Sequence, residues 1–245
     1  MNRFSHFQGW ELYLVLNLPF DTKMSPMRWF LSLCLLIPLL CLGQSPLNQG
    51  SSSTVWILSD LIHSDATGIN LAGKPELINS KYGKALLFNG LTDGIFLDQM
   101  PLAGLAAFTV EVIICPYSGG TFEQRYFHCG EIRGNRVMLE LRSTPTDWYL
   151  DAFIQSGEQK KTLIEPAYLH PLDQWAHLAF VVDHQTQATY VNGKKELESS
   201  LQIQPLREGK TSLGVRQNKI SWFRGAIYKI RISPKALSPG QFMVN

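Results

Sequence analysis

The residues best suited to chemistry in this chain are two adjacent aromatic rings with charged neighbours. Trp148 and Tyr149 follow a run of turn-forming residues, with Arg142 before that run and Asp151 shortly after the rings. Aromatic rings stack on the faces of sugars, while guanidinium and carboxylate groups orient a ligand by hydrogen bonding. Neighbouring residues of a strand point to opposite faces, so we expect one of the two rings to be exposed.

The other aromatic residues divide into candidates for ligand contact and candidates for the core. Trp222 precedes a long apolar segment and is counted with the binding residues. Tyr117, Phe122 and Tyr126 lie in or beside the loop around Gly119-Gly120. Core packing is the usual place for an aromatic residue in a sheet protein. We expect it for Trp56, Phe88, Phe108, Trp175 and Phe223.

Carboxylates spaced for glycoside hydrolysis do not occur along one strand. Such hydrolysis uses two carboxylates about 5 to 10 Å apart, and two residues of one strand share a face only at alternate positions. The closest match, Glu196 and Glu198, follows a hairpin turn and is expected at a solvated edge. Glu140 and Asp151 stand alone and would meet only if their strands are neighbours. We therefore predict that the protein is not an enzyme.

Nucleophile and metal motifs are also missing from the sequence. The histidines do not show the His-x-x-x-His spacing that gathers metal ligands, and no Cys-x-x-Cys occurs. His128 and Cys129 are adjacent, so on a strand they point to opposite faces and do not form a thiolate–imidazole pair. His177 is expected to be packed and hydrogen-bonded.

The elements that position these residues are short strands. Residues 175–182 are apolar on both faces, which is typical of a strand covered on both sides. A polar turn, a second strand at residues 188–191 and the hairpin dipeptide Asn192-Gly193 follow. Further apolar runs occur at residues 85–90, 94–97, 108–116 and 222–232. Strands separated by Gly, Pro and Asn turns predict an all-β sandwich.

These segments, in this order, resemble a laminin-G-like domain of the concanavalin A-like lectin/glucanase superfamily. Residues 175–194 resemble its signature hairpin of Trp, His, an apolar strand, an Asp turn and Tyr-Val-Asn-Gly-Lys. The other runs resemble the family's early strands, central strand and closing strand. The resemblance spans roughly residues 55–241 and implies a two-sheet antiparallel jelly roll. It implies no single activity, because function depends on sites added to a fold.

The resemblance also raises a calcium site, because many laminin-G-like domains bind one ion near the edge of the sandwich. Residues 65–70 resemble an Asp-x-Ser/Thr-Gly-x-Asn turn of such domains, so Asp65 and Asn70 are the candidate ligands. Where relatives carry an acidic pair in the closing strand, this chain has Tyr228 and Lys229. We expect no cofactor, with a structural calcium ion as the alternative.

The first 43 residues are expected to direct export. Arg28 precedes the apolar run 29–42, and small residues precede a cleavage position at Gln44, in the order of a signal peptide. The run is shorter than a membrane span and contains Pro38, although a retained N-terminal anchor remains an alternative. The expected parts are an upstream extension plus signal peptide at 1–43 (core 24–43), a flexible leader at 44–54 and the laminin-G-like domain at 55–245.

Export would place the two cysteines beyond the signal in an oxidising compartment. The balance of charge, in turn, limits the classes of partner. Cys115 and Cys129 lie beyond the signal, and either a disulfide between them or two packed thiols fits an oxidising compartment. With 22 basic and 20 acidic residues, the chain offers no electrostatic basis for binding nucleic acid.

The sequence therefore predicts a non-catalytic recognition module, secreted or at the cell surface and without a membrane span after signal cleavage. Carbohydrate is the expected ligand. The alternatives are a protein-binding or adhesion module of the cell envelope and a glycoside hydrolase or polysaccharide lyase with a non-standard site.

Overall fold

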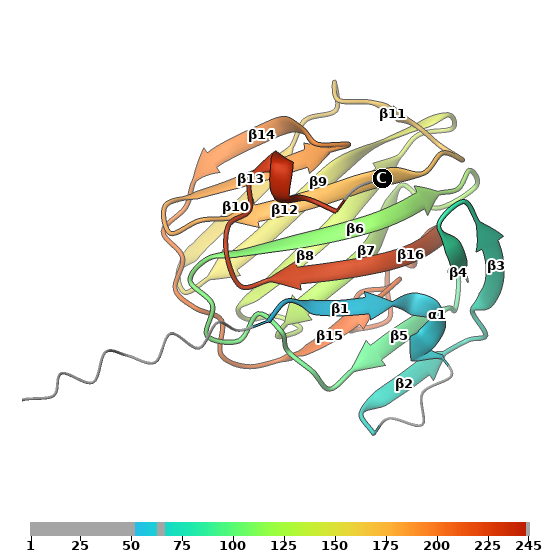
Figure 1. Cartoon of the computed structure of the whole chain (residues 1–245), viewed down its shortest axis with the longest axis horizontal. Coiled ribbons are helices and arrows are strands. Elements are labelled where there is room, and N and C mark those ends of the chain that lie inside the picture. Colours follow the sequence, from blue (N-terminus) through green and yellow to red (C-terminus); the bar gives the residue numbers. More distant parts are fainter. Residues whose placement is uncertain (1–51, 63–66, 244–245) are drawn as a thin grey trace, which may run out of the picture. The chain divides into compact units, whose positions relative to one another are not determined.

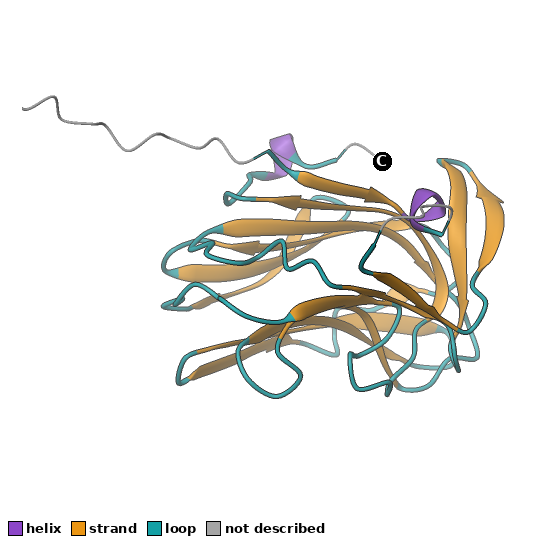
Figure 2. Cartoon of the chain, turned by 90° about the horizontal axis from the view of Figure 1, so that it is seen from below, coloured by secondary structure: helices purple, strands orange, loops and turns teal. Residues whose placement is uncertain are grey.

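Two antiparallel sheets stack face to face in the computed structural model, which describes residues 52–62 and 67–243 (Figures 1 and 2). Sheet A contains β1 (Thr54–Ile57), β3 (Glu76–Ser80), β4 (Gly83–Asn89), β6 (Phe108–Pro116), β12 (Ala176–Val182), β13 (Thr186–Val191), β14 (Lys194–Ser200) and β16 (Arg224–Ser233). Sheet B contains β2 (Ile69–Ala72), β5 (Gly94–Leu97), β7 (Glu123–Gly130), β8 (Arg136–Ser143), β9 (Asp147–Ser156), β10 (Gln159–Ile164), β11 (His170–Pro171) and β15 (Lys210–Leu213). Two short helices, α1 (Leu58–Leu61) and the 3₁₀ helix η1 (Pro239–Gln241), complete the set of elements.

The strand order confirms the predicted jelly-roll sandwich. Sheet A runs β14-β13-β12-β6-β16-β4-β3, with β1 paired to β16. Sheet B runs β10-β9-β8-β7-β15-β5-β2, with β11 paired to β9. The expected strands at 85–90 and 94–97 form as β4 and β5, but they lie in different sheets and do not pair with each other. The turn between them, held by Asp93 Oδ2 accepting from the Asn89 N–H (3.0 Å), carries the chain from one sheet to the other.

Strand β12 shows why residues 175–182 are apolar on both faces. Leu178, Phe180 and Val182 belong to the core between the sheets. The alternate residues Ala179 and Val181 pack against the C-terminal segment, mainly Leu237 and Phe242, on the outer face of sheet A. One strand therefore contributes to two apolar layers, as the double-sided pattern predicts.

A buried carboxylate fixes this C-terminal segment to sheet A. Glu111 Oε1 accepts hydrogen bonds from His177 Nε2 (3.0 Å) and the Met243 N–H (2.6 Å), and Oε2 accepts one from Arg231 Nε (2.5 Å). Burial raises the pKa of Glu111, but these donors outweigh it and hold the pKa below its ordinary value. The prediction that His177 is packed and hydrogen-bonded is confirmed.

The predicted hairpin and most of the predicted core are confirmed. Asn192 and Gly193 have φ of 49° and 78°, the positive values that a tight hairpin turn between β13 and β14 requires. Four of the five aromatic residues expected in the core lie there: Trp56, Phe88, Phe108 and Phe223. Trp175 does not, because it precedes β12 and lies half-buried against the edge of the Tyr82 ring, 5.5 Å between ring centres.

The disulfide alternative for Cys115 and Cys129 is wrong, because both are free thiols in different sheets. On β6, Val112 and Ile114 face the core, so Cys115 faces away from it. Cys129 faces the core from β7. Burial raises the pKa of Cys115 to about 12 and that of Cys129 to about 11, which keeps both as unreactive thiols at neutral pH.

Within residues 52–62 and 67–243, no helix has the length and apolar character that a membrane crossing needs.

Candidate functional site

The alternation of β8 and β9 places charged residues on the outer face of sheet B. Leu139 and Leu141 of β8 face the core, so Glu140 and Arg142 point the other way. On β9, Asp151 lies directly opposite Glu140 in the strand register. Two carboxylates that the sequence leaves in separate segments are therefore cross-strand neighbours.

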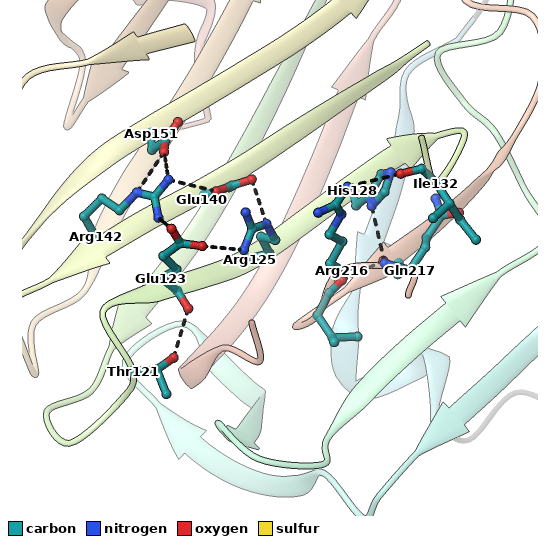
Figure 3. A network of polar contacts seen from close by, with 12 residues as sticks. Thr121, Glu123, Arg125, His128, Ile132, Glu140, Arg142, Asp151, Arg216 and Gln217 are labelled. Carbon is teal, nitrogen blue, oxygen red and sulfur yellow. Dashed lines mark hydrogen bonds and ion pairs between the residues drawn. The ribbon is translucent and has the colours of Figure 1, made fainter. Parts of the chain in front are cut away.

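Five side chains on this face form what we call the ionic network (Figure 3). Arg142 Nε donates to Asp151 Oδ2 (2.8 Å), its Nη2 contacts the same oxygen, and its Nη1 lies 2.5 Å from Glu123 Oε1. Arg125 Nε donates to Glu140 Oε1 (2.8 Å), and Arg125 Nη1 lies 3.3 Å from Glu123 Oε2. Glu123, the first residue of β7, thus joins the two arginines, and each of these contacts fixes a side-chain orientation.

Four of the five side chains of the network are largely buried, although the network lies outside the core. The side chains of Glu140 and Asp151 are 2% and 4% exposed, whereas that of Glu123 is 48% exposed. Burial raises the pKa of Glu140 to about 7, and the nearby Asp151 charge adds to the rise while Arg125 and Arg142 oppose it. Burial also raises the pKa of Asp151, against the lowering effect of Arg142. The face therefore holds a carboxyl group that titrates near neutral pH opposite a second carboxyl group.

An exposed aromatic ring lies at the edge of this network. Phe122, directly before β7, is 58% exposed, and the Arg142 guanidinium carbon lies 5.7 Å from the centre of its ring. The arrangement combines fixed donors and acceptors with an accessible ring face. These are the two features that sugar recognition needs.

The predicted binding residues are only partly brought together. Arg142 and Asp151 bond directly, and Tyr149 lies opposite Arg142 in the strand register. Trp148 points into the core instead, 1% exposed, with its Nε1 donating to the Pro171 carbonyl (3.1 Å) and its ring 4.6 Å from that of His170.

The prediction that one ring of the pair is exposed is therefore wrong. Trp148 and Tyr149 do point to opposite faces of β9, as alternation requires, but Tyr149 is only 8% exposed. The face that Tyr149 occupies is itself crowded by the side chains of the ionic network. Trp222 is half-buried beside Gly94 of β5. Its ring lies outside the ionic network.

The remaining sequence candidates are distributed as follows. Asp65 lies outside the described residues, and Asn70 is exposed on β2 opposite Phe96. Across the part of the chain that the structure describes, no group of three or more His, Cys, Asp or Glu residues is arranged to hold a metal ion. The calcium site at Asp65 and Asn70 stays a prediction.

Glu196 is not the solvated residue that the sequence suggests. Its side chain is 6% exposed, and its Oε1 lies 2.6 Å from His170 Nε2. Glu198, two residues on, is 46% exposed and pairs with Lys195, as expected for an edge. The two glutamates therefore do not act as a pair, because Glu196 contacts His170 of sheet B and Glu198 contacts Lys195.

The sequence interpretation missed Glu123 and Arg125 as site residues. Their signal is the alternation of charge at positions 123 and 125, which matches the alternation at 140 and 142. Two charged residues on one face of a strand indicate a polar outer face, but only the register shows that β7 and β8 place those faces side by side.

Two curved antiparallel sheets with a polar outer face define a lectin-like β-sandwich. A family model described as the concanavalin A-like lectin/glucanases superfamily, Laminin_G_3, matches residues 89–241, and the chain belongs to this family. No protein of curated function matches the sequence.

Three solved structures have a similar fold. Domain 4 of AbnA, a GH43 extracellular arabinanase from Geobacillus stearothermophilus, was solved in complex with arabinotriose; it is 24% identical with a TM-score of 0.56, over 77% of this chain and 85% of that one. The botulinum neurotoxin type G receptor binding domain is 9% identical (TM-score 0.53; 71% and 44% covered). The NanB sialidase from Streptococcus pneumoniae is 19% identical (TM-score 0.54; 64% and 26% covered). This chain thus spans less than half of the last two, and at these identities the likeness shows the fold alone.

Proposed function

We propose that this protein is a non-catalytic recognition module that binds carbohydrate on the outer face of sheet B, at the ionic network and Phe122. The observation that carries the proposal is a buried, mutually bonded set of charged side chains with an exposed ring at its edge. Glu123, whose side chain is 48% exposed, is the accessible acceptor of the network, and because Arg125 and Arg142 already fix its orientation, a sugar would bind with little loss of side-chain entropy. The arabinotriose bound to AbnA domain 4 supports a carbohydrate ligand.

The proposal includes export. The signal-peptide pattern within residues 24–43 supports a secreted or cell-surface location, where polysaccharides are accessible.

Replacing Phe122 with alanine is expected to weaken glycan binding roughly 3- to 10-fold, the range that loss of one stacked ring gives. The free energy of unfolding should change by less than about 0.5 kcal/mol, because the ring is mostly exposed. A glycan-array screen of the full chain, with calcium and again with chelator, identifies the ligand, and titration of that ligand compares the variants.

Leu91→Ala is the matched control, since Leu91 is 70% exposed in the turn between β4 and β5. It should bind as the unmodified protein does. Equal affinity of Phe122→Ala and the unmodified protein would move the site away from the ionic network. A screen with no glycan bound would favour protein recognition, the alternative from the sequence.

One observation favours a second candidate, a glycan-cleaving enzyme. Glu140, with a pKa of about 7, faces Asp151 across the β8–β9 register, and a general acid next to a carboxylate is the arrangement of glycoside hydrolases. Against it, Arg125 and Arg142 already occupy oxygens of both groups. We expect no new reducing ends when the protein is incubated with the glycan it binds. Release of reducing ends by the unmodified protein, but not by Glu140→Gln, would establish that the protein cleaves glycans.

A further inference from the structure

Two arginines on the outer face of sheet B have no carboxylate partner. Arg136 begins β8 and, by alternation, shares the outer face with Glu140. Its Nη1 donates to the Gly134 carbonyl (2.6 Å) and to Gln155 Oε1 (2.8 Å). Arg216 follows β15, and its Nη2 donates to the Ile132 carbonyl (3.2 Å). In contrast to Arg125 and Arg142, neither forms an ion pair with any residue of 52–62 or 67–243.

Each of these arginines also holds a buried donor without an acceptor. The Nε groups of Arg136 and Arg216 are buried, and no described residue accepts a hydrogen bond from either. A buried N–H without a partner is destabilising, and more so when it belongs to a charged group. Both arginines are only partly buried as whole residues, so their remaining guanidinium nitrogens can bond an oxygen-rich ligand that offsets part of this cost.

Contacts of the residue after Arg216 place the two arginines in one region: Gln217 Nε2 donates to the Gly130 carbonyl (3.1 Å), and Gly130 lies opposite Arg136 in the β7–β8 register. His128 of β7 is fully buried; its Nε2 donates to the Glu131 carbonyl (3.0 Å), and its Nδ1 accepts from the Gln217 N–H (3.3 Å). Burial lowers the pKa of His128 to about 4, and the charges of Arg216 and Arg136 lower it further. Figure 3 shows Arg216 and Gln217 extending toward this ring. His128 is therefore neutral and does not add to the local charge at neutral pH.

The positive charges of this region act on each other. Burial lowers the pKa of Arg136, and the charges of Arg216 and Arg125 lower it further, while Glu140 and Glu131 act in the opposite sense without forming an ion pair. Burial and the charge of Arg125 likewise lower the pKa of Arg216. A guanidinium held near another guanidinium is stabilised by an anion between them.

The plane of Arg136 is fixed by an aromatic ring. Its guanidinium carbon lies 4.7 Å from the centre of the Phe153 ring on the adjacent strand β9. This contact, with the bonds to Gly134 and Gln155, holds the side chain in one orientation before any ligand arrives. The unpaired arginines are thus positioned, and they lie on the same face as the ionic network.

We propose that Arg136 and Arg216, the arginine pair, bind the acidic group of an anionic glycan, a carboxylate or a sulfate. Guanidinium groups suit both anions because their planar donors bond two oxygens at once. This inference rests on the proposed function and names its ligand class. The neutral part of the glycan would extend over the ionic network and Phe122.

The test compares three oligosaccharides of similar length by titration calorimetry with the full chain: an oligogalacturonate, a sulfated galactan fragment and an uncharged galactan fragment. We expect an acidic oligosaccharide to bind more tightly than the neutral one. Tighter binding of the oligogalacturonate would identify a carboxylate as the acidic group, and tighter binding of the sulfated fragment would identify a sulfate. Arg136→Gln and Arg216→Gln should each weaken acidic binding at least 10-fold, the loss for one charged hydrogen bond. Neither should change binding of the neutral fragment.

Lys84→Gln is the matched control, because it removes the same charge from an exposed residue of β4 in sheet A. It should leave acidic binding within about twofold, since screened charges far from a site contribute little. Both arginine variants should unfold at a urea concentration close to that of the unmodified protein, because each loses hydrogen bonds but also a repelled, partly unpaired charge.

The possible failures are distinct. Equal binding of neutral and acidic fragments, or a loss in Lys84→Gln equal to that in the arginine variants, would overturn the anionic ligand and leave the carbohydrate proposal intact. Absence of binding to every oligosaccharide, in the titrations and in the glycan screen, would overturn both. Acidic binding that survives both arginine substitutions would place the acidic group elsewhere and end this assignment.

Discussion

Truncation of Trp148 to alanine should lower the free energy of unfolding by about 3–5 kcal/mol, the usual loss for a large aromatic residue in a core. Trp148 is 1% exposed, packs in the core between the sheets and donates from Nε1 to the Pro171 carbonyl. The substitution removes the ring, leaves a cavity and leaves the Pro171 carbonyl without this donor. A weaker glycan affinity in this variant would therefore report damage to the fold.

Urea unfolding followed by circular dichroism measures this loss without depending on tryptophan fluorescence. Trp148→Phe should lose less, because it keeps most of the ring volume and gives up mainly the hydrogen bond. Phe122→Ala, the truncation of an exposed ring, should leave the transition within about 0.5 kcal/mol. A Trp148→Ala variant as stable as the unmodified protein would mean that the ring does not lie in the core.

The fold was predictable because its signals are local. The double-sided apolar pattern of residues 175–182 and the dipeptide Asn192-Gly193 specify a covered strand and a hairpin turn from the sequence alone. The segment that covers the outer face of this strand, β12, could not be predicted from the neighbouring sequence. It is the C-terminal segment around Leu237 and Phe242, more than fifty residues later, whose packing no periodicity shows.

The candidate site was predictable only where its residues are close in sequence. Arg142 and Asp151 flank one turn, so a hairpin brings them together. Glu123 and Arg125 reach the same network from β7, whose register is set by the whole sheet. The face of a strand that points to the core is likewise set by distant parts of the chain. Alternation shows that Trp148 and Tyr149 point to opposite faces, and only packing decides which of them faces the core.

The face of the strand on which each residue lies also explains why the two cysteines do not form a disulfide. Cys115 and Cys129 are close enough in sequence for a disulfide. Cys115 lies on β6 in sheet A and faces away from the core, whereas Cys129 lies on β7 in sheet B and faces the core. Covering of sheet A by the C-terminal segment also bears on function. The ligand site that we propose lies instead on the outer face of sheet B, with its ionic network and arginine pair.

The stability of the protein should depend on pH through Glu140. Its pKa in the folded state is about 7 against an ordinary value of 4.5, so between these values the folded state holds a proton that the unfolded state releases. Stability is then lost as pH rises through this window. A shift of this size corresponds to up to about 3 kcal/mol, and Arg125 and Arg142 limit it.

Glu140→Gln isolates this effect, because glutamine keeps an acceptor for Arg125 Nε but does not titrate. Urea unfolding at pH 4.5, 6 and 8 should show the unmodified protein losing up to about 3 kcal/mol relative to the variant as pH rises, with most of the change complete near pH 7. Glu123→Gln is the control: burial raises the pKa of this half-exposed carboxyl group, but Arg142 and Arg125 outweigh it and hold the pKa below 4.5. Its effect therefore has the opposite sign, appears mainly below pH 4.5 and is small across the measured range. A difference between Glu140→Gln and the unmodified protein that does not vary with pH would mean that Glu140 stays ionised beside Arg125. That outcome would also remove the observation that favours a glycan-cleaving enzyme, because an ionised Glu140 has no proton to donate.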